Sequence, residues 1–134
     1  MHPHRILPMF VTDRLDATRR FYVEQAGFRV AFDCDGYLCV TYGEGEDEVA
    51  ISFVRPEAMT MLAERPFAGR GAVLSVPTPD ADRKAQELAD AGVAPLVPTE
   101  TRPWGWRSFL VRDPNGVLLD FFHVAAETPA DAAG

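Results

Sequence analysis

The chain has 134 residues, of which 47% are hydrophobic and 25% are charged, a balance typical of one small globular domain. Its formal net charge of −7 argues against nucleic-acid binding, which needs clustered lysine and arginine side chains to neutralise phosphates. No apolar run approaches the roughly 18 residues of a membrane span, and the N-terminus lacks the apolar stretch of a signal peptide. Because Cys34 and Cys39 are its only cysteines, we expect no disulfide framework and a cytoplasmic location.

The first half of the sequence predicts one long helix among four strands. A short apolar strand over 6–11 precedes a helix over 14–26, in which apolar residues recur at helical spacing, and Gly27 closes that helix. Three further strands are expected, at 28–33, 37–42 and 48–54. A short apolar helix over 57–64 then leads to a linker over about 65–70.

The second half repeats this order of elements. A strand over 72–76 leads to a second helix, with Thr78 as its expected N-cap and Pro79 as its first residue. Gly92 closes this helix 65 positions after Gly27, and the ends of the two preceding strands are separated by the same offset. Three more strands are expected, at 94–98, 107–112 and 117–123.

This repetition predicts an α+β fold in which two βαβββ modules form an eight-stranded curved sheet around a cleft. The modules are expected over about 5–64 and 71–124, and the small polar residues of 125–134 predict a frayed tail. Each module offers one amphipathic helix, which covers one face of one sheet. The other faces are therefore left to line the cleft.

Two segments resemble the vicinal-oxygen-chelate superfamily, which includes glyoxalase I, extradiol dioxygenases and bleomycin-resistance proteins. They are VTDRLDATRRFYVEQAGFRVAF (11–32) and PWGWRSFLVRDPNGVLLDFF (103–122). The second, with PWG followed by RDPNG, is most similar to the metal-free bleomycin-resistance branch. The resemblance implies a homodimer, and Pro8 is consistent with exchange of the first strand between subunits, because proline cannot donate within a central ladder.

The metal ligands of this superfamily match Ile6, Gly71 and Asp120 in the present sequence. Ile6 and Gly71 cannot bind a metal through their side chains, and one carboxylate alone cannot hold a divalent ion against water. A site that combined His4 with Asp120 would need further ligands. The remaining expectation for the histidines is that they are terminal or solvated: His2, His4 and His123. The sequence therefore predicts no metal and no other cofactor.

Side chains alternate along a strand, so parity predicts which residues share the cleft with Ile6 and Asp120. The cleft-facing set is then Pro8, Phe10, Val73, Ser75, Leu118 and Phe122. The opposite set is uniformly apolar, as a core requires: Leu7, Met9, Val11, Leu74, Val76, Leu119 and Phe121. A concave apolar surface with few polar groups is typical of a small-molecule pocket.

The ligand residues of the bleomycin-resistance branch can be carried over one position at a time. Its pocket aromatics match Phe32, Tyr37 and Trp104, and a strand serine matches Ser52. An acidic residue found in some relatives is replaced by Ala31, a departure that weakens the case for bleomycin itself. Aromatic faces bind planar or cationic groups by stacking, although each of these rings has core packing as its alternative.

Four more residues complete the candidate ligand set: Phe10, Trp106, Arg107 and Asp120. Trp106 follows PWG, and Arg107 is interpreted either as a partner for a ligand carboxylate or phenolate or as a solvated strand-end cation. Asp120 has three open interpretations: a general base, a pocket carboxylate for a ligand amine, or a salt-bridge partner within the sheet. No catalytic residue is assigned.

The leading hypothesis is a metal-independent binding protein that sequesters an aromatic or cationic antibiotic or metabolite, without nucleic-acid or membrane partners. Two alternatives stay open. One is a glyoxalase-like or dioxygenase-like enzyme of the same superfamily that acts on a small oxygenated substrate. The other is a small dimeric domain for regulation or assembly whose cleft is vestigial.

Overall fold

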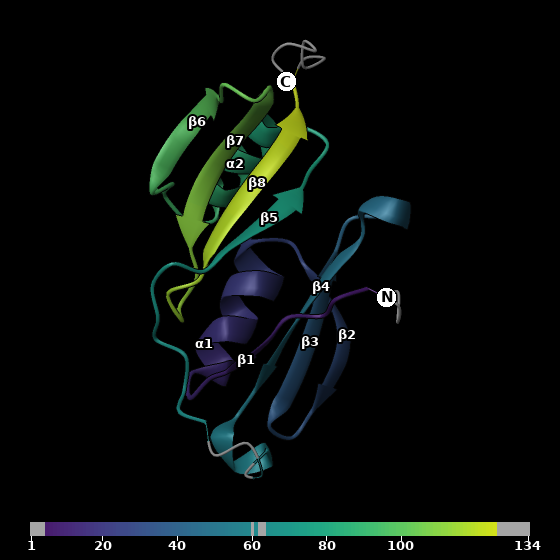
Figure 1. The fold of residues 1–134 in the computed structure, drawn as a ribbon, viewed down its shortest axis with the longest axis vertical. Helices are drawn as coiled ribbons and strands as arrows, with labels where there is room; N and C mark the ends of the chain where they lie inside the picture. Colours follow the sequence, from purple (N-terminus) through teal and green to yellow (C-terminus); the bar gives the residue numbers. More distant parts are fainter. Residues whose placement is uncertain (1–4, 60, 62–63, 126–134) are drawn as a thin grey trace.

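The computed structural model of the chain describes residues 5–59, 61 and 64–125, which form two modules stacked along the long axis (Figure 1). Module 1 contains β1 (Met9–Val11), α1 (Leu15–Arg19), the π-helical segment η1 (Arg20–Gln25), β2 (Arg29–Cys34), β3 (Tyr37–Tyr42), the 3-10 turn η2 (Gly45–Asp47), β4 (Val49–Val54) and the 3-10 turn η3 (Pro56–Ala58). Module 2 contains β5 (Val73–Pro77), α2 (Ala81–Asp90), β6 (Val97–Thr101), β7 (Trp106–Arg112) and β8 (Leu118–Val124). In the described part of the chain, no helix is long and apolar enough to cross a membrane.

Each module has a mixed four-stranded sheet. The strand orders are β1-β4-β3-β2 and β5-β8-β7-β6, so the two sheets have the same topology. In both sheets the first strand runs parallel to the last, and the other pairs are antiparallel. The predicted α+β fold of two repeated βαβββ modules is confirmed, with its eight strands divided between two sheets.

Three predicted elements begin at least two residues later in the structure. β1 begins after Pro8, which has no N–H to donate, and β6 begins at Val97 rather than at residue 94. The N-cap of α2 is Asp80, whose Oδ1 accepts the Arg83 N–H at 3.1 Å, whereas the Thr78 hydroxyl is bound elsewhere. In place of the helix expected over 57–64, the structure shows the turn η3 and 3-10 conformation at Met61, and residues 60, 62 and 63 lie outside the described residues.

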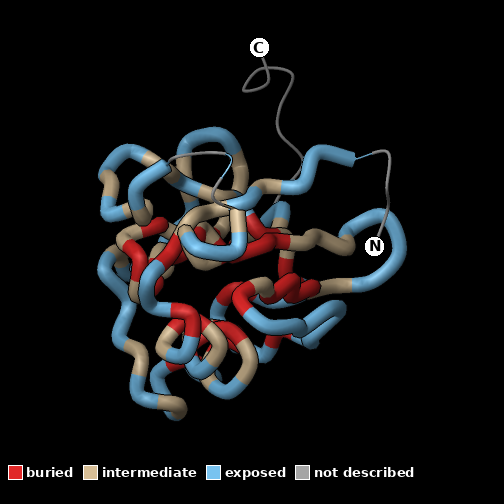
Figure 2. Tube along the Cα trace, turned by 90° about the horizontal axis from the view of Figure 1, so that it is seen from below, coloured by how far each residue is buried: buried red, intermediate tan, exposed pale blue. Residues whose placement is uncertain are grey.

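One apolar core contains buried residues of both modules, and Figure 2, which looks along the long axis, shows the buried segments in the middle of the molecule with exposed segments around them. Phe28 of module 1 contacts Phe121 of β8 edge to face, with ring centroids 6.5 Å apart. Tyr42, at the end of β3, contacts the same ring at 5.9 Å. The helix-covered side of each sheet is therefore the side that joins the two modules.

The Asp-Pro-Asn-Gly turn between β7 and β8 adds a buried polar contact to this boundary. Asp113 accepts a hydrogen bond from the Tyr22 hydroxyl at 2.7 Å. Asn115 accepts from the Thr12 hydroxyl at 2.6 Å and donates to the Thr18 hydroxyl at 3.0 Å. Thr12 precedes the first helical segment, Thr18 lies in α1 and Tyr22 lies in η1. The turn therefore contacts both the start and the middle of that segment. The turn sequence therefore positions module 2 as well as closing a hairpin.

A second polar contact crosses the boundary from α2. Lys84 donates from Nζ to the backbone oxygen of Ala26 at 2.5 Å, just after the end of η1. The ammonium group also lies 4.6 Å from the centre of the Tyr42 ring. Desolvation lowers the pKa of Lys84, and the neighbouring Glu87 carboxylate partly offsets that effect. A cation at the C-terminal end of a helix is favourable, so Lys84 stabilises the packing of α2 against the end of η1.

Candidate ligand-binding surfaces

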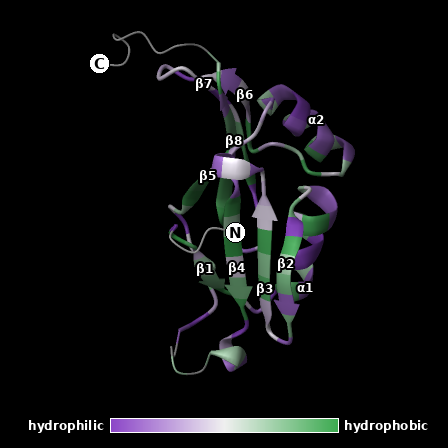
Figure 3. Ribbon diagram, turned by 90° about the vertical axis from the view of Figure 1, so that its right-hand side faces the viewer, coloured by the Kyte–Doolittle hydropathy of each residue, from purple (hydrophilic) through white to green (hydrophobic). Residues whose placement is uncertain are grey.

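In the described part of the chain, each sheet has one face that carries no helix, and we call these the module 1 open face and the module 2 open face. Figure 3 shows α1 and α2 on the same side of their sheets, which leaves the other side uncovered. In module 1, Phe53 contacts Tyr22 at 5.0 Å and so points to the helix side. The neighbouring Ser52 therefore points to the open face.

The module 1 open face brings together three of the predicted ligand residues. Tyr37 and Ser52 share a hydrogen bond of 2.8 Å between their hydroxyl groups. The ring of Phe32 packs against the ring of Tyr37 at 5.6 Å and 61°, and Phe32 is 54% exposed. Ser52 itself is fully buried, so it orients the Tyr37 hydroxyl, while the two aromatic rings form the accessible surface.

Phe10 lies on the side opposite to the one expected, and the expectation for the first strand is wrong. The parallel register pairs Phe10 with Phe53 and Met9 with Ser52, which turns Met9 to the open face. The Phe10 ring stacks on Phe53 at 6.0 Å and meets Phe67 edge to face at 5.1 Å. Phe10 is therefore a core residue rather than part of the module 1 open face.

The module 2 open face follows the predicted parity. The register pairs Asp120 with Ser75 on β5 and with Leu110 on β7, and it pairs Phe122 with Ser108. These five side chains therefore share the face without a helix. The residues of opposite parity are buried on the helix side, as expected: Val76, Leu119 and Phe121.

An aromatic stack lies at one end of the module 2 open face. The rings of Trp106 and Phe122 are parallel within 9° and their centroids are 3.8 Å apart. Trp104 lies in the turn before β7 and is 53% exposed. Arg102, which the sequence analysis did not single out, donates from Nε to the Ser108 hydroxyl at 3.0 Å and fixes one edge of this surface.

Asp120 lies on the same face, two residues before Phe122 on β8. Its Oδ2 accepts a hydrogen bond from the Ser75 hydroxyl at 3.3 Å. Its Oδ1 is buried and has no hydrogen-bond partner within residues 5–59, 61 and 64–125. Among the residues that the structure describes, no lysine or arginine forms an ion pair with this carboxylate, so the interpretation as a salt bridge within the sheet finds no support.

Arg107 and His123 form a directly opposed pair on β7 and β8, on the helix side of the sheet. Arg107 binds both carboxylate oxygens of Asp82 on α2, at 2.7 and 2.9 Å, and these bonds lower the pKa of Asp82. Arg107 is therefore directed away from the open face where a ligand contact was expected.

The expectation that His123 is solvated is wrong, because its Nδ1 accepts the backbone N–H of Ala81 at 2.8 Å and caps α2.

The metal-ligand positions do not assemble a metal site. Asp120 is flanked by Ser75 and Leu110, and Gly71 precedes β5 and has no side chain to contribute. Ile6 carries no donor atom either. In the ranges 5–59, 61 and 64–125 there is no group of three or more histidine, cysteine, aspartate or glutamate side chains with metal-binding geometry. His2 and His4 lie outside the described residues.

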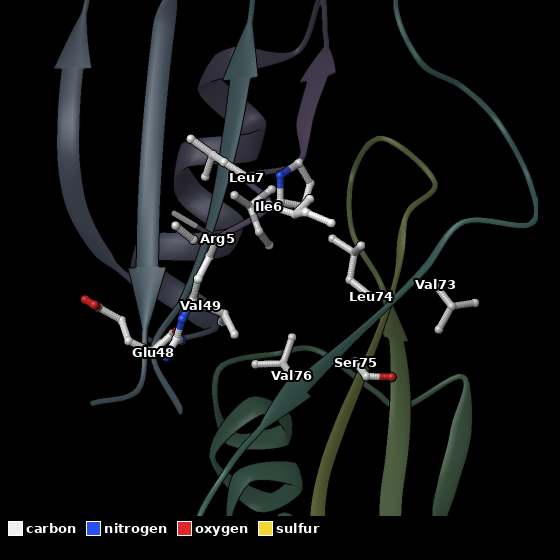
Figure 4. Close-up of a pocket in the computed structure, with 12 residues that line it drawn as sticks. Arg5, Ile6, Leu7, Glu48, Val49, Val73, Leu74, Ser75 and Val76 are labelled. Atoms are coloured by element: carbon white, nitrogen blue, oxygen red, sulfur yellow. The ribbon is translucent and has the colours of Figure 1, made fainter. Parts of the chain in front are cut away.

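One cavity lies at the junction of the two modules rather than on an open face. It has a volume of about 540 Å³ and is lined by residues 5–8, 48–51 and 73–76. In Figure 4, Leu74 and Val76 of β5 point toward this space, whereas Val73 and Ser75 point away from it. Ile6, on its rim, is 93% exposed, so an apolar edge of the molecule is open to solvent.

A comparison with protein families agrees with this fold. The sequence model of the "Glyoxalase/Bleomycin resistance protein/Dioxygenase superfamily" matches residues 4–121. The chain belongs to this superfamily. Membership confirms the resemblance found in the segments 11–32 and 103–122.

Solved structures of other superfamily proteins are similar over most of the chain. A glyoxalase/bleomycin resistance protein/dioxygenase from Nocardioides has 22% identity and a TM-score of 0.69, over 91% of this chain and 83% of that one. An antibiotic-binding protein, TnmS3, from Streptomyces sp. CB03234 has 27% identity and a TM-score of 0.63, over 90% and 94%. A bleomycin resistance determinant encoded on the transposon Tn5 has 19% identity and a TM-score of 0.65, over 91% and 98%. A comparison with curated proteins found no match.

Proposed function

We propose that this superfamily member is a small-molecule binding protein that sequesters a planar aromatic or cationic compound without a metal and without turnover. The observation that carries the proposal is the presence of an aromatic platform on each open face. One platform is Phe32 with Tyr37, and the other is Trp106 stacked on Phe122. Similarity to TnmS3, described as an antibiotic-binding protein, supports a ligand of the drug-resistance type.

Stacking supplies the affinity in this proposal. A well-placed aromatic pair contributes about 0.5–1.5 kcal/mol beyond the burial of its surface. A ligand held between two platforms gains that contribution twice, together with the hydrophobic effect of burying its ring. Phe32 is half exposed, and the rings of Trp106 and Phe122 are partly exposed, so both surfaces are accessible to a ligand.

A homodimer is part of the proposal, because the two platforms point away from the boundary that joins the modules of one chain. The contacts across that boundary, such as Phe28 with Phe121, come from the helix sides of the sheets. A closed site therefore needs the module 1 open face of one copy to lie opposite the module 2 open face of a second copy. The exposed apolar edge around Ile6 supports such an association, since monomers rarely expose large apolar patches.

Tryptophan fluorescence titrations against a panel of planar aromatic drugs test the proposed function. We expect saturable quenching or a spectral shift, retained in Trp104→Phe and strongly reduced in Trp106→Phe, because Trp106 belongs to the stacked platform. Metal analysis of protein purified without chelators is the companion measurement. Stoichiometric zinc, nickel, iron or manganese would contradict the metal-free site, and a panel without any binder would contradict sequestration.

A further inference from the structure

The module 2 open face contains an acceptor atom for which the described residues supply no donor. Oδ1 of Asp120 is buried and has no hydrogen-bond partner, while Oδ2 of the same carboxylate accepts from Ser75. Leaving a buried acceptor unsatisfied costs free energy, so such an atom in a folded protein requires an explanation. Its position beside an aromatic platform indicates that the missing donor comes from a ligand.

The arginines of β7 and of the turn before it have other partners, and Arg112 donates to the backbone oxygen of Gly116 at 3.1 Å. Arg102 donates to Ser108, and it also forms an ion pair of 3.4 Å with Glu100. Arg107 lies on the opposite side of the sheet with Asp82. The negative charge of Asp120 is therefore not balanced by these side chains, in a protein whose formal net charge is already −7.

The distance between the carboxylate and the aromatic platform limits the shape of the ligand. Asp120 and Phe122 are two residues apart on β8, and two residues of a strand span about 6.6 Å. Both side chains point to the same face, and the Trp106 ring lies flat against Phe122. A ligand that uses both features must place a hydrogen-bond donor roughly 7 Å from the centre of a planar ring.

We infer that the module 2 open face binds an aromatic amine, with its ring on the Trp106–Phe122 stack and its protonated nitrogen on Oδ1 of Asp120. This inference rests on the proposed function and narrows its ligand class. A cation satisfies the observations better than a neutral donor does, because a charge-assisted hydrogen bond is about twice as strong as a neutral one. An anionic ligand is disfavoured, since a carboxylate has only acceptor atoms to offer it.

A set of three indole probes of similar size tests the inference: tryptamine, which is cationic, tryptophol, which is neutral, and indole-3-propionate, which is anionic. Each is titrated into ¹⁵N-labelled full-length protein, and binding is read from the amide resonances of β8 and from the indole N–H of Trp106. We expect tryptamine to bind about tenfold more tightly than tryptophol, which corresponds to one charge-assisted hydrogen bond. Indole-3-propionate should bind more weakly than tryptophol.

Two variants test whether Asp120 causes the preference for tryptamine over tryptophol. Asp120→Asn should reduce the affinity for tryptamine to that for tryptophol and leave tryptophol binding unchanged. Glu24→Gln removes one exposed carboxylate from η1 and should retain the full preference, which excludes an effect of net charge. Thermal unfolding of both variants shows that each is folded.

The outcomes separate this inference from the proposed function. If all three probes bind with equal affinity, or if Asp120→Asn retains the preference, the amine assignment is wrong while ligand binding stands. If no probe shifts the Trp106 resonance and the drug panel gives no binder, both are wrong. If Asp120→Asn instead lowers the oligomeric state in sedimentation, Oδ1 belongs to a subunit contact and the amine assignment is overturned.

Discussion

The hydroxyl group of Tyr22 donates a 2.7 Å hydrogen bond to Oδ2 of Asp113, across the boundary between the two modules. Tyr22 is fully buried, and the other oxygen of Asp113 accepts the backbone N–H groups of Asn115 and Val117. One carboxylate therefore shapes the turn between β7 and β8 and binds that turn to the first helix. The open faces keep their relative orientation because buried polar contacts of this kind hold the modules together.

Replacing Tyr22 with phenylalanine should destabilise the fold. The substitution leaves one oxygen of the buried Asp113 without its donor, which costs about 1–3 kcal/mol of unfolding free energy. Urea denaturation followed by circular dichroism measures the change. Tyr42→Phe is a matched control, because the Tyr42 hydroxyl bonds to Thr78 at a half-buried position and should cost less. Equal losses in the two variants would contradict the importance assigned to the buried pair.

The same tyrosine should contribute to unfolding at alkaline pH. Burial raises the pKa of Tyr22 well above its usual 10.0, and the Asp113 carboxylate raises it further. The folded state thus favours the protonated hydroxyl, so its stabilisation is complete below pH 10 and is lost as the pH rises toward the folded-state pKa. The stability of Tyr22→Phe should fall less steeply above pH 10 than that of the native chain, by up to about 1.4 kcal/mol per pH unit. Urea titrations between pH 8 and 11 test this, and parallel curves would refute it.

The sequence predicts the element order and the module 2 open face because both depend on local patterns. The helix spacing, the closing glycines and the alternation from Leu118 to Phe122 are readable along one segment of chain. The same alternation gave the wrong face for Phe10. Its orientation depends on a parallel register with β4, some 40 residues away, which no local pattern specifies.

The sequence also does not predict the polar contacts between the modules. Lys84 and Ala26 meet although 58 positions separate them, and Arg107 is drawn to the helix side by Asp82, 25 positions earlier. A long basic side chain reaches whichever carboxylate or carbonyl the tertiary fold brings near it, so composition alone leaves its partner open. Tyr37 and Ser52 were placed by the family resemblance, and they lie diagonally across the adjacent strands β3 and β4, where Tyr37 pairs with Val54 and Ser52 with Cys39.

The cap that His123 provides for α2 predicts different effects for two substitutions. His123→Asn supplies a side-chain oxygen that accepts the Ala81 N–H in place of Nδ1, whereas His123→Leu removes the acceptor. We expect the leucine variant to lose about 1 kcal/mol of unfolding free energy, a typical value for a helix cap, and the asparagine variant to lose less. Equal thermal unfolding temperatures for the two variants would show that the 2.8 Å bond contributes little.

Asp120 should reduce the stability of the ligand-free protein. Its unsatisfied Oδ1 costs free energy in the folded state, and the substitution Asp120→Leu removes the charge and fills the row beside Leu110 with an apolar side chain. We expect this variant to be more stable by about 1–3 kcal/mol in urea denaturation. Ser75→Ala, which removes the hydrogen bond from the Ser75 hydroxyl to the carboxylate, should be less stable than the native chain. A destabilised Asp120→Leu variant would show that the carboxylate is fully satisfied in solution.

The proposed dimer predicts that a charge on the apolar edge disrupts association. Ile6 is 93% exposed at the rim of the cavity between the modules, and Ile6→Asp would place an unpaired carboxylate in a subunit interface. Sedimentation velocity should show a dimer for the native chain and a shift toward monomer for Ile6→Asp. Leu96→Asp is the matched control, because Leu96 is also more than half exposed but precedes β6, the strand at the opposite edge of its sheet from β5, and it should remain dimeric. A native chain that sediments as a monomer would contradict the closed site, since each open face would then bind its ligand alone.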